Sequence, residues 1–274
     1  MRGVIKKTSP SCYNQGMNHS ITSLILDMDG VIWRGSQVIG DLPEIFRRIA
    51  DKGMKFTLVT NNATRTPQDY VERLTQLGVY VSCDQVVNSG VATAAYLSEI
   101  FPGGGDIFIV GERGLLDAMN EYGFAHSERT PLAVVAGLDR KLTYEKLSKA
   151  TLLIRSGLPF IGTNPDNSIP TTRGLEPGAG SILAALEAAS NASPKVIGKP
   201  NPEMYEVALK RLGSKPEETI VVGDRLETDI AGAQALGCPT ALVLSGVATR
   251  EQAEAWLPRP DFIVSDLTEL LSRI

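Results

Sequence analysis

The chain has 274 residues, of which 43% are hydrophobic and 21% charged, so it holds enough apolar material for the cores of two domains. Its formal net charge of -4 indicates no basic surface, and we therefore expect no nucleic-acid partner. No stretch approaches the roughly 18 apolar residues of a membrane span, and the polar start of the chain lacks the apolar segment of a secretory signal. These features predict a cytoplasmic protein without membrane contact.

The beginning of the chain reads as an extension rather than as part of a domain. Residues 1–20 are polar, and Met17, just before the first predicted strand, is a candidate alternative start. The three cysteines, Cys12, Cys83 and Cys238, have no metal-type spacing and are interpreted as inert packing residues in a reduced compartment.

Short apolar runs then alternate with amphipathic helices. Ile21–Leu26 is a predicted strand that ends at Asp27, and Lys55–Val59 is a second strand that ends at Thr60. Between them, Leu42–Lys52 carries its apolar residues at helical spacing. Each predicted strand is therefore followed directly by a polar residue.

The middle of the chain interrupts this regularity. Pro102–Gly105 breaks the pattern, and residues 164–180 are rich in Pro, Gly, Thr and Asn. We predict that residues 101–179 form an inserted second domain, and that residues 21–100 and 180–274 form one discontinuous core.

The alternation resumes in the last third of the chain. Asn201-Pro202 is predicted to start a helix, and Thr219–Val222 is a β-branched strand that ends at Gly223-Asp224. Thr228 is predicted to cap a short helix that ends at Gly237.

Apolar strands alternating with helices predict an α/β fold, a doubly wound, Rossmann-like parallel sheet with a smaller α/β domain inserted. Such sheets bind their ligands beyond the carboxyl ends of the strands. Asp27, Thr60 and Asp224 each follow a strand directly, so we expect the functional site at this edge.

The sharpest motif is Asp27-Met28-Asp29-Gly30. The turn that Gly30 permits can bring both carboxylates into one pocket, where one can attack phosphorus and the other can handle the proton of the leaving oxygen. Two carboxylates beside a phosphate repel one another, so a hard cation such as Mg²⁺ is needed. The alternative is an ordinary Asp-Gly turn with a second, surface Asp.

A second acidic cluster lies in the segment GDRLETDI. Asp224 ends a strand and could complete a metal site, and Asp229, one helical turn later, could support the ligands by hydrogen bonds. Asp229 could equally be a helix cap whose charge lies near the positive end of the helix.

Two further segments carry groups that suit phosphate. Thr60-Asn61-Asn62 offers a hydroxyl and backbone N–H groups at a strand end, although Asn-Asn is also common turn chemistry. Lys199, held between Gly198 and Pro200, could neutralise phosphate and nucleophile together, or could be a solvated surface lysine.

Other phosphate and hydrolase chemistries lack their residues. The two histidines, His19 and His126, lie beside no motif, which argues against a histidine-based phosphatase or a Ser-His-Asp hydrolase. No Walker A sequence is present, so an ATPase of that type is not expected.

In their order, DMDG, TNN, GKP and GDRLETD resemble the haloacid dehalogenase superfamily of phosphatases, and the resemblance covers nearly the whole chain beyond residue 20. The long insertion resembles the cap of subclass IIA, the NagD-type and 4-nitrophenylphosphatase-like group. Thr163–Asp166 and Gly178–Ser181 are also similar to that subclass.

The resemblance implies roles for the acidic motifs. Asp27 would be the nucleophile and a Mg²⁺ ligand, and Asp29 the general acid and base, with its backbone carbonyl touching the metal. Asp224 would be a further metal ligand, supported by Asp229.

The resemblance also implies how the substrate is held. Thr60, Asn61 and Asn62 would bind the phosphoryl group, and Lys199 would hold the phosphate and the nucleophile together. From the cap, Asn164 and Asp166 are the candidates for substrate contact, although Asp166 could instead bridge or position the cap.

The resulting hypothesis is a phosphatase that hydrolyses a small phosphorylated metabolite through an aspartyl-phosphate. Phosphoglycolate, glycerol phosphate, nucleoside monophosphates, sugar phosphates and pyridoxal phosphate all suit the subclass. The alternatives are a non-catalytic binding or regulatory protein, a receiver-type phosphoacceptor, and a phosphotransferase to an alcohol. By analogy, the cap surface could form a homodimer.

Overall fold

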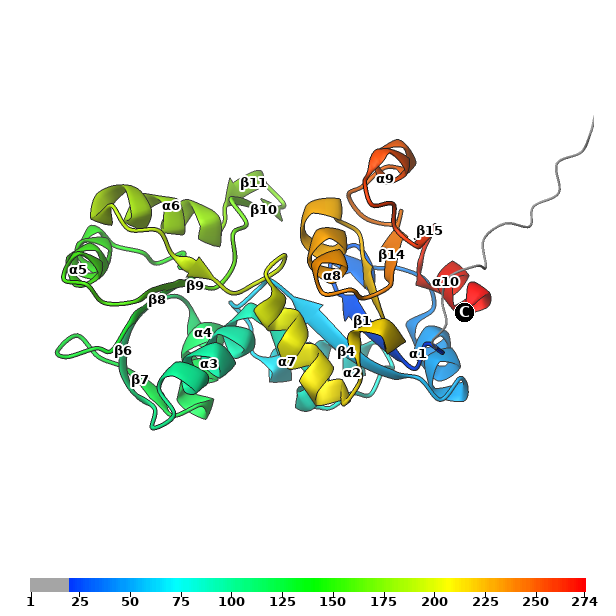
Figure 1. The fold of residues 1–274 in the computed structure, drawn as a ribbon, viewed down its shortest axis with the longest axis horizontal. Coiled ribbons are helices and arrows are strands. Elements are labelled where there is room, and N and C mark those ends of the chain that lie inside the picture. Colours follow the sequence, from blue (N-terminus) through cyan, green and yellow to red (C-terminus); the bar gives the residue numbers. More distant parts are fainter. Residues whose placement is uncertain (1–19) are drawn as a thin grey trace, which may run out of the picture.

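The computed structural model describes residues 20–274, which form two α/β lobes side by side (Figure 1). Residues 1–19 lie outside the described part of the chain. They include all of the predicted N-terminal extension except Ser20, the alternative start at Met17, and the residues Cys12 and His19. Over the described part of the chain, no helix combines the length and the apolar character needed to cross a membrane.

The core lobe is built on a six-stranded parallel sheet with the order β15-β14-β13-β1-β4-β5. Its strands are β1 (Ser23–Asp27), β4 (Lys55–Thr60), β5 (Val86–Asn88), β13 (Thr219–Gly223), β14 (Thr240–Val243) and β15 (Phe262–Val264). Strand β1 is central and pairs with β13 on one side and with β4 on the other. The predicted parallel α/β fold is confirmed, and the ends of β1, β4 and β13 come together at one edge.

Helices cover both faces of this sheet because successive strand residues point to opposite faces. Leu24 and Leu26 pack with α1 (Leu42–Asp51), α2 (Pro67–Gln76) and α10 (Leu267–Arg273). Ile25, on the opposite face, packs in a cluster with α3 (Ser89–Ile100), α7 (Pro202–Leu212) and α8 (Ala231–Ala235). Strand β1 is therefore buried on both sides, which holds the residue at its end rigidly.

The second lobe has its own five-stranded parallel sheet, with the order β12-β9-β8-β6-β7. Its strands are β6 (Gly105–Val110), β7 (Phe124–His126), β8 (Val134–Ala136), β9 (Phe160–Gly162) and β12 (Lys195–Val196). One face is covered by α5 (Tyr144–Arg155) and α6 (Ala179–Ser190), and α4 (Arg113–Glu121) packs with α3 of the core on the other. The two lobes thus share one hydrophobic cluster.

The second sheet extends beyond the predicted insertion. Strand β12 pairs with β9, so the cap sheet includes a strand, Lys195–Val196, that lies after residue 179 in the sequence. The limits of the inserted domain, 101–179, stay a prediction. We call the second lobe the cap from here on.

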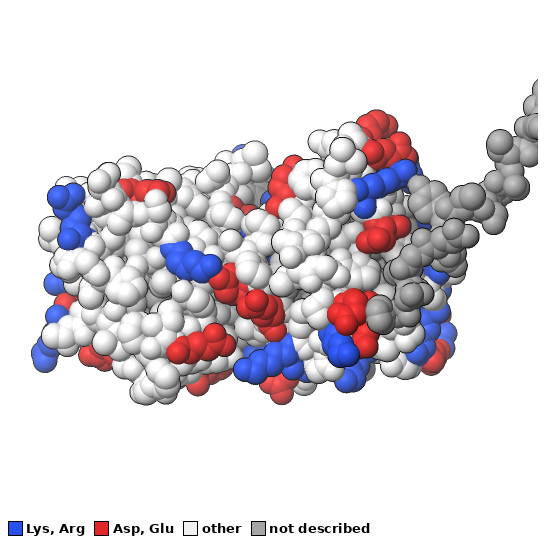
Figure 2. Space-filling model, in the orientation of Figure 1, with Lys and Arg blue, Asp and Glu red and all other residues white. Residues whose placement is uncertain are grey.

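Two antiparallel hairpins lie near the junction of the lobes. Strands β2 (Trp33–Arg34) and β3 (Gln37–Val38) follow the DMDG motif, and β10 (Ser168–Thr171) and β11 (Gly174–Pro177) extend from the cap toward the core (Figure 1). Lys, Arg, Asp and Glu side chains are interspersed over the face shown in Figure 2.

Two local predictions are wrong. Thr228 does not cap a helix but lies inside a π-helical turn (Leu226–Ile230), because the Arg225 carbonyl accepts bonds from the N–H groups of Asp229 and Ile230 and widens the turn. Cys83 is exposed rather than packed, since it begins a short 3-10 helix at the surface, whereas Cys238 is buried.

Helix α9 (Arg250–Ala255) begins with a capping box. The side chain of Thr249 accepts a bond from the Gln252 N–H, and the side chain of Gln252 accepts one from the Thr249 N–H.

Candidate active site

A pocket of about 620 Å³ opens where the carboxyl ends of the core strands face the cap. Its lining includes every side chain that the sequence singled out: Asp27, Asp29, Thr60, Asn61, Asn62, Asn164, Asp166, Lys199, Asp224 and Asp229. These residues come from five separate stretches of the chain, and only the fold brings them together.

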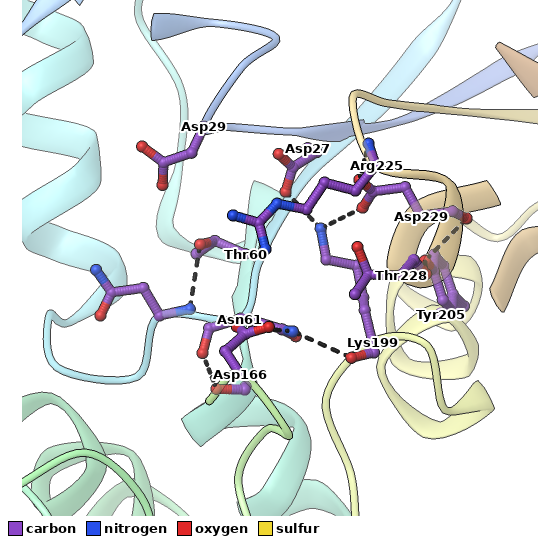
Figure 3. Close-up of polar contacts among 12 residues, drawn as sticks. Asp27, Asp29, Thr60, Asn61, Asp166, Lys199, Tyr205, Arg225, Thr228 and Asp229 are labelled. Atoms are coloured by element: carbon purple, nitrogen blue, oxygen red, sulfur yellow. Dashed lines mark hydrogen bonds and ion pairs between the residues drawn. The ribbon is translucent and has the colours of Figure 1, made fainter. Parts of the chain in front are cut away.

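A buried ion-pair network lies at the base of the pocket (Figure 3). The Lys199 ammonium group contacts Asp27 Oδ1 and donates to Asp229 Oδ1 at 2.7 Å. All three side chains are buried, with Lys199 only 3% exposed. Lys199 is therefore not a solvated surface lysine, and Asp229 is more than a helix cap.

The charges in this network are unbalanced. Burial raises the pKa of Asp27 well above its usual range, although the Lys199 ammonium group pulls that pKa down. Burial alone would lower the pKa of Lys199, but the carboxylates of Asp229 and Asp27 outweigh it and raise that pKa well above its usual value. One ammonium group thus serves two buried carboxylates, and a further cation would relieve the excess negative charge.

The DMDG segment turns as soon as β1 ends. The Met28 carbonyl accepts bonds from the N–H groups of Ile32 and Trp33, and Gly30 has a φ of +89°, which favours glycine. Asp29 is thereby brought to the same pocket as Asp27, where its Oδ1 accepts a 3.2 Å bond from Trp33 Nε1. Burial raises the pKa of Asp29, which favours the protonated form of this carboxyl group.

Two glycines make room for Asp224. A Cβ atom on Gly30 or on Gly246 would lie 2.3 Å or 1.9 Å from Asp224 Oδ2, so neither position accepts a side chain. That same oxygen accepts a 2.8 Å bond from the Val247 N–H. Burial, followed by the charge of Asp229, raises the pKa of Asp224 to about 6.

Three buried carboxylates lie close enough together to form a candidate metal site. Oxygen atoms of Asp27, Asp224 and Asp229 lie within 4.8 Å of one another. Asp229 uses both oxygens already, one for Lys199 and one for the Arg225 N–H, whereas Asp27 and Asp224 each bond the protein through only one oxygen. The free oxygens are hard donors that suit a divalent cation, and the carboxylate of Asp29 lies outside this group.

The segment Thr60–Asn62 forms a tight loop at the end of β4. Thr60 Oγ1 accepts a 3.2 Å bond from the Asn62 N–H, and Asn62 Oδ1 accepts bonds from the N–H and hydroxyl of Thr64. The Asn62 side chain therefore maintains the loop, and the buried Thr60 hydroxyl is held at the pocket wall.

Asn61 joins the core to the cap. Its Nδ2 donates to Asp166 Oδ2 at 3.2 Å and to the Lys199 carbonyl at 3.1 Å (Figure 3). Its own carbonyl accepts a 2.8 Å bond from Asn164 Nδ2. Asn164 and Asp166 thus contact the core loop directly. This geometry favours the bridging interpretation of Asp166.

Several residues of the site were not predicted from the sequence. Tyr205 Oη donates to the carbonyls of Thr228 and Asp229, at 3.0 and 3.2 Å, and so supports the π-helical turn that presents Asp229. The pocket is also lined by four arginines: Arg34, Arg65, Arg140 and Arg225. Only proximity to a motif, as for Arg225 beside Asp224, could have indicated them, since an isolated arginine carries no spacing pattern.

The chain matches the family model of haloacid dehalogenase-like hydrolases over residues 24–125, and a HAD-hydrolase-like model over residues 196–270. It is 35% identical over 250 residues to the 5'-nucleotidase YutF of Bacillus subtilis, an alignment that covers 91% of this chain and 97% of that protein. It is 37% identical over 251 residues to an acid sugar phosphatase of Staphylococcus aureus, covering 91% and 96%.

Solved structures resemble the whole fold, cap included. A p-nitrophenyl phosphatase from Archaeoglobus fulgidus has a TM-score of 0.88 and 31% identity over 93% of this chain and all of its own. NagD from E. coli K-12 has a TM-score of 0.85 and 33% identity, covering 92% and 98%. A glycerol phosphate phosphatase from Mycobacterium tuberculosis, solved in complex with calcium, has a TM-score of 0.84 and 36% identity, covering 90% and 74%.

Proposed function

The chain belongs to the haloacid dehalogenase-like hydrolases of the NagD and 4-nitrophenylphosphatase type, and it is a phosphatase of small phosphomonoesters; we propose that Asp27 is its nucleophile and Mg²⁺ its metal ion. The observation that carries this proposal is the buried contact between Lys199 and Asp27 at the end of β1. It engages one oxygen of Asp27 and leaves the other without a bond to the described part of the protein.

Asp224 would hold the ion through its free oxygen and Asp27 through Oδ1, the oxygen that also contacts Lys199, with Asp229 supporting Lys199 rather than the metal. Bound there, Mg²⁺ would supply positive charge for the phosphate oxygens and for the buried carboxylates. The Asp29 backbone carbonyl stays a proposed additional ligand.

In the first step, the free Asp27 oxygen attacks phosphorus and the bond between phosphorus and the ester oxygen breaks. The leaving oxygen takes a proton from Asp29, whose raised pKa allows it to carry that proton. Lys199 stabilises the developing charge, and Thr60 and the Asn61 loop hold the phosphoryl group. The product is an aspartyl-phosphate on Asp27 and a free alcohol.

In the second step, Asp29, now a carboxylate, takes a proton from a water molecule. The water oxygen attacks phosphorus, the bond to Asp27 breaks, and inorganic phosphate leaves. Asp27 returns as a carboxylate and Asp29 is protonated again, so the cycle closes without another reactant.

The proposed substrates are those in the names of the relatives, namely a nucleotide, a sugar phosphate or glycerol phosphate, with 4-nitrophenyl phosphate as a surrogate. The pocket volume of about 620 Å³ suits ligands of this size.

The test is phosphate release from a panel of these esters with added Mg²⁺, comparing the native protein with Asp27→Asn. This change keeps the shape of the side chain but removes its charge, and we expect turnover to fall at least about 10³-fold. Asp84→Asn, a matched change at an exposed position outside the pocket, should leave turnover intact. If the native protein binds Mg²⁺ but releases no phosphate from any ester, a non-catalytic binding protein is the better description.

A further inference from the structure

Five cationic side chains line the pocket, and three of them are already engaged. Lys199 pairs with Asp27 and Asp229. Arg140 forms a two-pronged pair with Glu112, and Arg34 donates to the backbone carbonyls of Ser245 and Gly246.

Arg65 and Arg225 differ from the other three cations that line the pocket. Among residues 20–274, neither guanidinium group donates a hydrogen bond or forms an ion pair with a protein group. The nearest effect of Arg65 is on another cation, because the pKa of Arg73 is lowered first by burial and then by the positive charge of Arg65. A guanidinium group without a partner at a pocket wall is a ready binding group for a carboxylate or phosphate.

The two arginines stand on either side of Asp27. Arg65 lies five residues beyond the end of β4 and Arg225 two residues beyond the end of β13, and these strands flank β1. Figure 3 shows the Arg225 side chain extending over the pocket toward Thr60. Both side chains line the same pocket as Asp27, so the leaving part of a phosphomonoester bound there is open to contact with them.

Both arginines are held by their backbones. The Arg65 carbonyl accepts a 2.7 Å bond from Asn88 Nδ2, and α4 packs so closely that a Cβ atom on Gly114 would lie 2.6 Å from the Arg65 backbone. The Arg225 N–H donates to Asp229 Oδ2 at 3.1 Å. The backbone atoms from which the two side chains extend are thus fixed before a ligand binds, which lowers part of the entropic cost of binding.

Resting on the proposed function, we propose that Arg65 and Arg225 bind a second anionic group on the leaving part of the substrate. Among the phosphomonoesters that the protein hydrolyses, those that carry a carboxylate on the leaving part are then turned over faster than the esters of neutral alcohols named above. Asp29, Asp166 and Asp224 attract Arg225 from a distance, but none is bonded to it, so its donors stay available to the ligand.

The experiment compares two esters that differ in a single group, 3-phosphoglycerate, with a carboxylate, and glycerol 3-phosphate, with a hydroxymethyl group in its place. We expect the native protein to prefer the carboxylate by about tenfold or more in kcat/KM, the usual effect of a hydrogen bond between charged groups. Arg65→Gln and Arg225→Gln should each bring this ratio toward one. Arg155→Gln, which removes an exposed arginine at the end of α5, should retain the native ratio.

A native ratio near one overturns the proposal. So does an equal loss for both esters in the two variants, because the arginines would then act on the phosphoryl group or on the fold. The affinities of both esters for Asp27→Asn protein, measured by calorimetry with Mg²⁺, give the same comparison without turnover. Failure of hydrolysis would therefore contradict the proposed function while the anion preference is still measured.

Discussion

The two sides of the pocket differ in how their charged groups are held. On the core side, Asp27, Lys199 and Asp229 are buried and bonded to one another at the ends of a sheet that is covered on both faces. On the cap side, Asn164 and Asp166 meet the core through single hydrogen bonds to Asn61, and the hairpin β10–β11 is largely exposed. The difference indicates that chemistry depends on a rigid core, whereas the cap can vary to select the leaving group.

Removing the central cation should give the largest difference between the two lobes. Lys199→Met leaves Asp27 and Asp229 buried without their partner, and we expect the free energy of unfolding to fall by about 3–5 kcal/mol, with loss of turnover. The matched change in the cap is Lys146→Met, which breaks a 2.6 Å pair with the buried Asp139. Because Lys146 is partly exposed, that change should cost about 1–3 kcal/mol and spare turnover.

Urea unfolding and phosphate release measure both variants. If the two substitutions cost the same stability, or if Lys199→Met still turns over substrate, the distinction between a catalytic core and a selective cap is wrong.

Metal binding should act on the core side alone, and it should depend on pH. The folded pKa of Asp224 lies at about 6, above the usual 3.8, so the folded metal-free protein holds this proton more tightly than the unfolded chain does. Its stability should therefore decline as the pH rises from about 4 to about 6. Since a metal requires the carboxylate, Mg²⁺ at 100 times its Kd should add about 2.7 kcal/mol at pH 7.5 and less at pH 5.

Thermal unfolding with and without Mg²⁺ at the two pH values is the measurement. Asp224→Asn should abolish the Mg²⁺ effect, whereas the cap variant Lys146→Met should retain it. An Mg²⁺ effect of equal size in Asp224→Asn would place the ion elsewhere.

The smallest effect is expected at the contact between the lobes. Asp166→Ala removes the acceptor for Asn61 Nδ2 and should cost about 1 kcal/mol of stability, with about a tenfold fall in kcat/KM as the Asn61 loop loosens. Asp166→Asn, which keeps one acceptor oxygen, should lie between the native protein and the alanine variant. Unchanged kinetics in Asp166→Ala would mean that this bond does not position the loop.

Local patterns predicted the core elements well. The strand at Lys55–Thr60 and the helix α1 lie within a residue of their expected bounds, because their apolar residues follow the periods of strand and helix. The motif residues were also found, since each follows directly after a strand. Thr228 was misjudged because a π-helical turn arises from backbone bonding and from support by Tyr205, 23 residues away in sequence, which no local signal records.

The sequence by itself determined the family, the parallel sheet and the candidate residues at the strand ends, because short-range periodicity and motif order carry that information. Tertiary structure alone decided which charges meet. Lys199 reaches Asp27 across 172 residues of sequence, β12 pairs with the cap sheet, and Arg65 and Arg225 come to flank the nucleophile. Such contacts depend on chain segments that are distant in sequence and are brought together by burial of the sheets, so no local pattern specifies them.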